Sequence, residues 1–150
     1  MTAMRTKTAL VLDAATAVAW AFEDEANAYA DMVLETLTEG QAYTPNIWPL
    51  EVGHALLLAE RLGRLEQAST VQFLELLGQL PIFIEVERSE RLLAEYLALA
   101  RTQGLSISKA AYLHLAMRRG LPLATNDAAL REAARQVGVP LFGQSTAATG

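Results

Sequence analysis

Hydrophobic and polar positions follow one another along the chain in a pattern that predicts short strands separated by helices. Short apolar runs bounded by turn residues are typical of buried strands, and apolar residues every three or four positions are typical of helices. The expected strands are Ala9–Leu12, Ala42–Thr44, Ile82–Val86, Leu123–Thr125 and Val139–Phe142. The expected helices are Ala14–Phe22, Asn27–Leu37, Pro49–Arg61, Glu66–Leu77, Ser89–Arg101, Ser106 or Ser108 to Arg118, and Asp127–Gln136.

This order of elements indicates an α/β fold with a mostly parallel sheet covered by helices on both faces. The length of 150 residues fits a single domain spanning residues 1–150, and the ends, residues 1–6 and 144–150, are expected to be loosely ordered. In sheets of this kind, ligands bind at the carboxyl ends of the strands. Polar residues directly after a strand are therefore the first candidates for a functional site.

Composition narrows the class of protein. The chain is 52% hydrophobic, but no apolar run reaches the roughly 18 residues that span a bilayer, and no export signal is apparent. We therefore expect a cytoplasmic protein with no membrane association. The absence of cysteine excludes disulfides, thiol catalysis and cysteine-based zinc sites. The net charge of −5 argues mildly against a nucleic-acid binder, unless part of that charge is a cluster of acids that holds a cation.

Three acidic residues stand where chemistry is expected. Asp13 follows the first apolar strand, and Asp127 follows Leu123–Thr125. Either aspartate could instead be only the N-cap of the next helix. Glu51 lies early in an apolar helix, where a carboxylate needs a partner or a cation unless it serves only the helix dipole. His54, one turn later on the same face, is more often a satisfied histidine than a ligand.

Converging carboxylates favour a divalent cation with hard oxygen ligands. With no cysteine and only two histidines in the chain, Mg²⁺ or Mn²⁺ is the best match. One or two such ions could activate a water molecule and stabilise the developing charge on a phosphoryl oxygen. The acids therefore indicate a metal-dependent phosphodiesterase.

Four motifs, in this order and spacing, give the chain a family resemblance. They are Val11-Leu12-Asp13-Ala14 with Val18-Ala19-Trp20, Pro45 with Trp48-Pro49-Leu50-Glu51-Val52, Leu105-Ser106 with the run from Ala110 to Ala116, and Leu123-Ala124-Thr125-Asn126-Asp127. With these motifs the chain resembles PIN-domain proteins of the VapC type, which are toxin ribonucleases. The resemblance covers nearly the whole chain and implies a three-layer sandwich with a mostly parallel central sheet.

The resemblance also implies an activity and partners. It implies a Mg²⁺- or Mn²⁺-dependent endoribonuclease that hydrolyses RNA phosphodiesters, with no other cofactor. Asp13, Glu51 and Asp127 match three metal-binding and catalytic acids of the family, and Thr125 and Asn126 are expected beside them. The implied partners are an antitoxin of the VapB type, an RNA substrate and a second copy of the chain in a homodimer.

Lys109 departs from the family pattern. It stands where the family carries a further acid, and His54 stands where many members carry asparagine. No carboxylate lies between Tyr96 and Asn126 to replace the missing acid. Three arrangements are open: the Lys109 ammonium pairs with the acids in place of the metal, it contacts a substrate phosphate while the acids hold one ion, or it extends into solvent.

Three functions follow from these arrangements. The first is a ribonuclease whose activity Lys109 impairs. The second is a degenerate PIN domain that binds an antitoxin or RNA without cleavage. The third is an unrelated α/β phosphatase or nucleotide-binding protein in which the acids only cap helices.

Overall fold

A four-stranded parallel sheet forms the middle layer of the protein in the computed structural model, which describes residues 7–22, 24–25, 27–86 and 90–143. The strands are β1 (Ala9–Leu12), β2 (Gln41–Pro45), β3 (Ile82–Glu85) and β4 (Leu123–Ala124). Their order in the sheet is β3-β2-β1-β4, and every neighbouring pair is parallel. Consequently, the carboxyl ends of β1 and β4 lie side by side, with Leu12 opposite Ala124.

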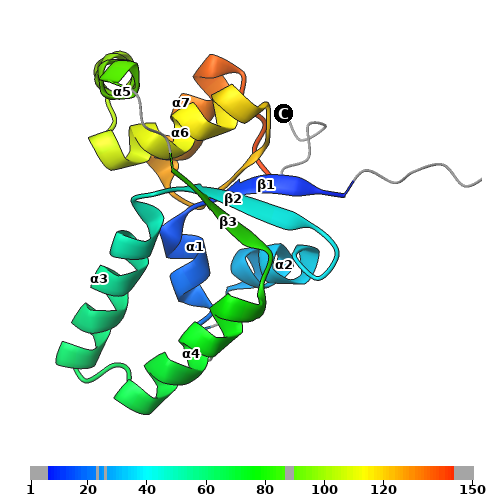
Figure 1. Ribbon diagram of the computed structural model, residues 1–150, viewed down its shortest axis with the longest axis vertical. Helices are drawn as coiled ribbons and strands as arrows, with labels where there is room; N and C mark the ends of the chain where they lie inside the picture. Colours follow the sequence, from blue (N-terminus) through cyan, green and yellow to red (C-terminus); the bar gives the residue numbers. More distant parts are fainter. Residues whose placement is uncertain (1–6, 23, 26, 87–89, 144–150) are drawn as a thin grey trace, which may run out of the picture.

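Seven helices in the described part of the chain make the outer layers. They are α1 (Ala14–Ala19), α2 (Ala28–Thr36), α3 (Trp48–Arg61), α4 (Gln67–Gln79), α5 (Glu90–Gln103), α6 (Ile107–Arg119) and α7 (Ala128–Val137). Helices α1 to α4 lie on one side of the sheet and α5 to α7 on the other (Figure 1). This arrangement confirms the expected α/β three-layer sandwich. Within the described ranges, no helix is both long and apolar enough to cross a membrane.

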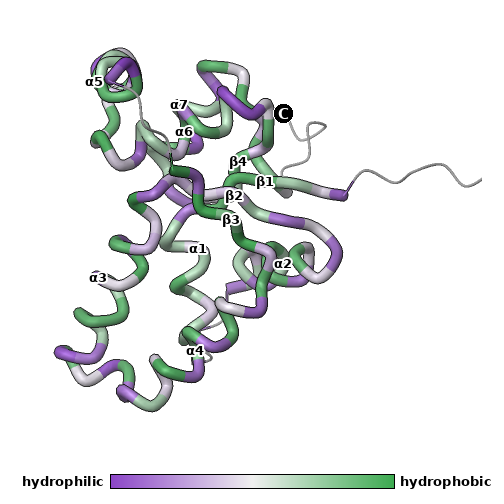
Figure 2. The backbone as a smooth tube through the Cα atoms, in the orientation of Figure 1, coloured by the Kyte–Doolittle hydropathy of each residue, from purple (hydrophilic) through white to green (hydrophobic). Residues whose placement is uncertain are grey.

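The core lies between the sheet and the inner faces of the helices. Leu10, Val11 and Leu12 of β1 are fully buried, because helices cover both faces of this central strand. In the layer of α5 to α7, helix α6 contributes most to the core, with six buried residues. Figure 2 shows hydrophobic stretches along the strands and mixed positions on the surrounding helices. Helix α6 ends at Arg119, and the next residue, Gly120, has a φ of 65°, the left-handed conformation that stops a helix.

Most elements differ from the sequence prediction by only one or two residues at their ends, and two differences are larger. The predicted strand Val139–Phe142 is wrong: this segment makes one isolated bridge, from Leu141 to Leu123, flanked by only two backbone hydrogen bonds. Pro140 offers a carbonyl but no N–H, and a turn follows at Phe142, so the ladder does not extend. Helix α1 also ends at Ala19, earlier than predicted. Ser89, the predicted helix cap, and the two chain ends lie outside the described residues.

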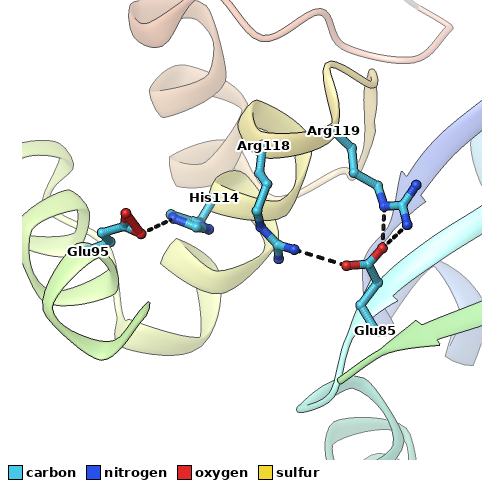
Figure 3. A network of polar contacts seen from close by, with 5 residues as sticks. All are labelled: Glu85, Glu95, His114, Arg118 and Arg119. Carbon is cyan, nitrogen blue, oxygen red and sulfur yellow. Dashed lines mark hydrogen bonds and ion pairs between the residues drawn. The ribbon is translucent and has the colours of Figure 1, made fainter. Parts of the chain in front are cut away.

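A carboxylate shared by two arginines fastens the edge strand β3 to helix α6 (Figure 3). The half-buried Glu85 accepts a hydrogen bond from Arg118 at 2.9 Å and is also bonded by Arg119. The Arg119 guanidinium carbon lies 4.0 Å from the centre of the Tyr43 ring on β2. These contacts join β2, β3 and α6 at one end of the sheet. Because one carboxylate serves two cations, its removal affects both arginines.

We expect Glu85→Gln to lower the free energy of unfolding by about 1–2 kcal/mol, since it removes the charge from a partly buried ion pair network. Glu132→Gln is the matched control, because Glu132 is exposed and its contact with Arg135 is 3.4 Å long. The control should change stability by less than about 0.5 kcal/mol. Urea unfolding of both variants measures the difference, and equal effects would show that Glu85 is an ordinary surface acid.

Helix α5 is attached differently. It has no buried residue and packs on α6. In the contact drawn in Figure 3, His114 of α6 lies 3.1 Å from a carboxylate oxygen of Glu95. The Tyr96 ring meets the His114 imidazole edge-on, with 5.2 Å between centroids. The helix therefore packs on α6 through partly buried side chains, Leu99 among them, rather than through fully buried ones.

Candidate functional site

Asp13 joins the end of β1 to the start of α1. Its Oδ1 accepts a hydrogen bond from the backbone N–H of Thr16 at 2.9 Å, so it is the N-cap of α1. Its Oδ2 accepts a hydrogen bond from the hydroxyl of Thr125, which follows β4. The residue is only 5% exposed, and this burial raises the pKa of the Asp13 carboxyl although both hydrogen bonds act to lower it. Asp13 is thus the N-cap of α1 and also lines a cavity.

Asp127 has the corresponding place after β4. Its Oδ2 accepts a hydrogen bond from the backbone N–H of Leu130 at 2.9 Å and caps α7. Its backbone N–H donates to the Thr125 hydroxyl at 3.0 Å. Thr125 therefore bridges Asp127 to Asp13 through one buried hydroxyl group. Parallel pairing of β1 with β4 brings the two aspartates to the same edge of the sheet.

Lys109 lies across from Asp127. Its Nζ is 2.9 Å from Oδ1 of Asp127, and both side chains are partly exposed. Partial burial pulls the pKa of the Asp127 carboxyl upward, but the hydrogen bonds from Lys109 and the α7 backbone outweigh it, so this pKa lies below its ordinary value. In this structure the Lys109 ammonium therefore forms a direct ion pair with one acid rather than extending into solvent.

Glu51 reaches the same region from α3. It lies in the first turn of that helix, whose start carries Pro49 and no side-chain cap. Its Oε1 accepts a hydrogen bond from the Tyr112 hydroxyl at 2.5 Å. Burial, and then this contact with a carboxylate, raise the pKa of the Tyr112 hydroxyl, so Tyr112 stays a donor. The partner that the sequence analysis required for Glu51 is therefore a phenol.

Tyr112 is the site residue that the sequence analysis did not identify. It lies three residues after Lys109 on α6, and residues at this spacing share one face of a helix. Once Lys109 was recognised as a site position, that spacing was the available signal. Helix α6 thus supplies two donors, an ammonium and a phenol, to two different acids.

The two remaining predicted site residues, Asn126 and His54, are exposed, and neither bonds to the acids within the described part of the chain. Asn126 is exposed, and its Oδ1 accepts a hydrogen bond from Arg131 at 3.2 Å. Arg131 also donates to the backbone carbonyl of Thr125 at 2.9 Å and so holds the loop that carries Asp127. His54 is exposed and lines the same cavity as the acids.

The cavity that joins these residues has a volume of about 640 Å³. The three acids, Lys109 and Tyr112 line it together with apolar residues of α1 and α3, including Val18 and Leu50. Arg64 also lines the cavity, where it pairs with Glu25 at 2.7 Å and its guanidinium carbon lies 4.9 Å from the centre of the Phe22 ring. The site is therefore a groove lined by both charged and apolar side chains.

The arrangement does not fit a divalent ion as it stands. Among the residues that the structure describes, no three acidic or histidine side chains come close enough to one another to hold a metal ion together. Both carboxylate oxygens of Asp13 and of Asp127 already have donors from the protein. The ligand set that the resemblance implies is present in one cavity, but each acid is engaged by its own partner.

Solved structures with similar folds are known. The Pyrobaculum aerophilum protein PAE2754 has a TM-score of 0.65 and 23% identity, over 85% of this chain and 86% of that one. VapBC2 from Rickettsia felis, bound to a DNA fragment from its promoter, gives 0.61 and 14%, over 89% and 97%. A toxin–antitoxin complex from Klebsiella pneumoniae gives 0.51 and 19%, over 79% and 86%. At these identities the likeness shows the fold alone.

Comparison of the sequence with curated proteins and with family models gives the remaining evidence. None of the curated proteins compared with the chain matches it significantly in sequence. The model of the PIN domain matches residues 10–136, a segment that contains Asp13, Glu51, Lys109 and Asp127. Because the match covers most of the sequence and agrees with the sheet order and helix layers, the chain belongs to the PIN-domain family.

Proposed function

We propose that the chain is the toxin-type component of a toxin–antitoxin pair, with a site built for phosphodiester hydrolysis of RNA and an activity that Lys109 lowers. The main support for this proposal is one observation. Asp13, Glu51 and Asp127 come from three distant segments and line one cavity at the carboxyl edge of a PIN-type sheet. A site at this edge follows the general rule for open α/β sheets. Membership of the PIN family supports the nuclease class.

The proposed partners follow from the structural relatives. A toxin–antitoxin complex and a VapBC2 assembly share this fold, which supports an antitoxin of the VapB type as the partner. The family resemblance adds a homodimer and a cytoplasmic location to the proposal.

Within the site, the chain's own residues have separate roles in this proposal. The Thr125 hydroxyl bonds to both Asp13 and the backbone of Asp127. Arg131 holds the loop between β4 and α7 that carries Thr125 and Asp127. The apolar wall of the groove excludes water from one side of a bound strand. The ammonium of Lys109 occupies the oxygen of Asp127 that Mg²⁺ or Mn²⁺ would otherwise bind.

A second candidate is a degenerate PIN domain that binds an antitoxin or RNA without cleaving it. One observation favours it: each of the three acids already accepts a hydrogen bond or an ion pair from the protein. In such a site each acid already has a donor from the protein before any ligand binds, and Asp127 also has a cationic partner. The two candidates share fold and partners and differ only in hydrolysis.

Cleavage of a mixed RNA pool separates the candidates. With Mg²⁺ or Mn²⁺ present, we expect slow cleavage by the chain that falls by roughly tenfold or more in Asp13→Asn, since removing a reacting-site charge has effects of this order. Asparagine caps helices as well as aspartate does, so this variant keeps the cap of α1. RNA retention in a gel is measured on the same samples.

Binding without cleavage would select the second candidate. If the chain neither cleaves nor binds RNA at protein concentrations well above those of the pool, the proposal that RNA is the substrate is contradicted. Cleavage that is unchanged in Asp13→Asn would place the activity in another part of the molecule or in a contaminant.

A further inference from the structure

The position of Lys109 is unusual for a lysine in a helix. Ser106 caps α6 and accepts a hydrogen bond from the backbone N–H of Lys109 at 3.2 Å, so Lys109 lies in the first helical turn. The helix dipole disfavours a cation in that turn and favours an anion. The helix dipole therefore does not account for a lysine at this position. The ion pair with Asp127 across the groove does account for it.

Each of the three acids of the site has one side-chain donor from another segment of the chain. Lys109 donates to Asp127 at 2.9 Å, and Tyr112 donates to Glu51 at 2.5 Å. The third acid, Asp13, accepts from the hydroxyl of Thr125. In this arrangement each acid has a hydrogen-bond donor from the protein, and Lys109 supplies a positive charge at Asp127, whereas the donors to Asp13 and Glu51 are neutral hydroxyl groups.

The charge difference from an all-acid site is large. With aspartate at position 109 the four positions would carry −4 when ionised, whereas with lysine they carry −2. A divalent ion bound at Asp127 would meet the ammonium of Lys109, which lies 2.9 Å from that carboxylate, and like charges at that distance repel strongly. Lys109 thus removes one ligand and adds one competitor.

We propose that the ammonium of Lys109 is the built-in counter-ion of the acid site, and that it takes the place of the divalent ion and keeps Mg²⁺ and Mn²⁺ out. The inference rests on the proposed function only in treating Asp13, Glu51 and Asp127 as the site. It concerns ion binding in the protein without RNA.

Calorimetric titration of the full chain with Mn²⁺ tests this inference. We expect no saturable binding to the unchanged protein at millimolar Mn²⁺, and binding that is roughly 100-fold tighter in Lys109→Asp. Lys7→Asp is the matched control, because Lys7 and Lys109 are the only lysines in the sequence and Lys7 is exposed outside the groove. It makes the same charge change and should bind no better than the unchanged chain.

Thermal unfolding supplies a second measurement. The melting temperature of the unchanged chain should be the same in Mn²⁺ and in chelator, whereas Lys109→Asp should melt lower in chelator and recover with Mn²⁺. Lys109→Met, which removes the cation without adding an acid, should bind Mn²⁺ with intermediate affinity. This variant keeps the test decisive if four acids without metal do not fold.

Two results would overturn the inference. One is saturable Mn²⁺ binding by the unchanged chain that is lost in Asp127→Asn, because the ammonium would then coexist with the metal. The other is the same weak binding in folded Lys109→Asp and Lys109→Met as in the unchanged chain. Failure to cleave RNA bears on the proposed function and leaves these ion-binding results in force.

Discussion

Lys109→Asp is expected to raise RNA cleavage in the presence of Mg²⁺ by roughly 100-fold or more over the chain as it stands. The substitution removes the ammonium from Asp127 and places a fourth carboxylate in the cavity. Oxygen ligands of this kind suit Mg²⁺ and Mn²⁺. Two units of local charge within a few ångströms correspond to several kcal/mol, and each 1.4 kcal/mol is about a factor of ten in rate. The rate on a mixed RNA pool is the measurement.

The controls separate the site from general charge effects. Lys7→Asp makes the same change in net charge and should leave the cleavage rate as it is. Adding Asp13→Asn to Lys109→Asp should remove most of the gain, because both positions line the same cavity. A folded Lys109→Asp that binds Mn²⁺ but cleaves no RNA would contradict the assignment of RNA hydrolysis while leaving the metal competition intact.

Thr125→Val should lower the free energy of unfolding by about 2–4 kcal/mol, the second large effect. Thr125 is fully buried, and its hydroxyl donates to Asp13 while accepting from the backbone of Asp127. Valine has nearly the same shape, so packing is kept. However, the change leaves a buried carboxylate oxygen and a partly buried backbone N–H without a partner, and each costs about 1–2 kcal/mol, the lower part of the usual range. Urea unfolding in the presence of chelator measures the loss.

The loss should also depend on pH. Burial already raises the pKa of Asp13, and the Thr125 hydrogen bond acts to lower it. Removing that bond raises the folded-state pKa of Asp13 further above its unfolded value. An acid of this kind destabilises the fold as pH rises from the unfolded toward the folded pKa, so Thr125→Val should be more damaging at pH about 8 than at pH about 5.

Thr125→Ser keeps the hydroxyl and should recover much of the stability and the weaker pH dependence. Thr38→Val is the control for loss of an exposed hydroxyl bond, since Thr38 donates only to the backbone of Glu35. It should change stability by less than about 0.5 kcal/mol. If Thr125→Val and Thr38→Val behave alike at both pH values, the bridge between the two aspartates has no energetic importance.

The sequence was sufficient for the parts of the site that depend on local order. Asp13 and Asp127 follow apolar strands, and parallel strands place their carboxyl ends together, so their convergence could be predicted. Ser106 was one of two predicted caps and is the cap that forms. The fold class followed from the same alternation of strands and helices.

Contacts between distant segments were beyond the reach of pattern alone. Tyr112 is 61 residues from Glu51, and nothing local to either residue indicates that a phenol rather than an ion would serve that glutamate. Whether Lys109 would pair with an acid, contact a phosphate or extend into solvent depended on the side-chain geometry of α6 and α7. The wrong final strand has a similar origin, because an apolar run containing proline looks like a strand until its hydrogen bonds are counted.

The double duty of the two aspartates has a consequence for how such chains evolve. Asp13 and Asp127 cap α1 and α7, so selection for folding alone would keep a capping residue, aspartate or asparagine, at both positions whether or not the chain cleaves RNA. An aspartate at either position is therefore weak evidence of a working nuclease in any descendant of this lineage. Position 109 caps nothing, and Glu51 makes no capping bond for α3, so drift at these two positions is the more informative record of lost activity.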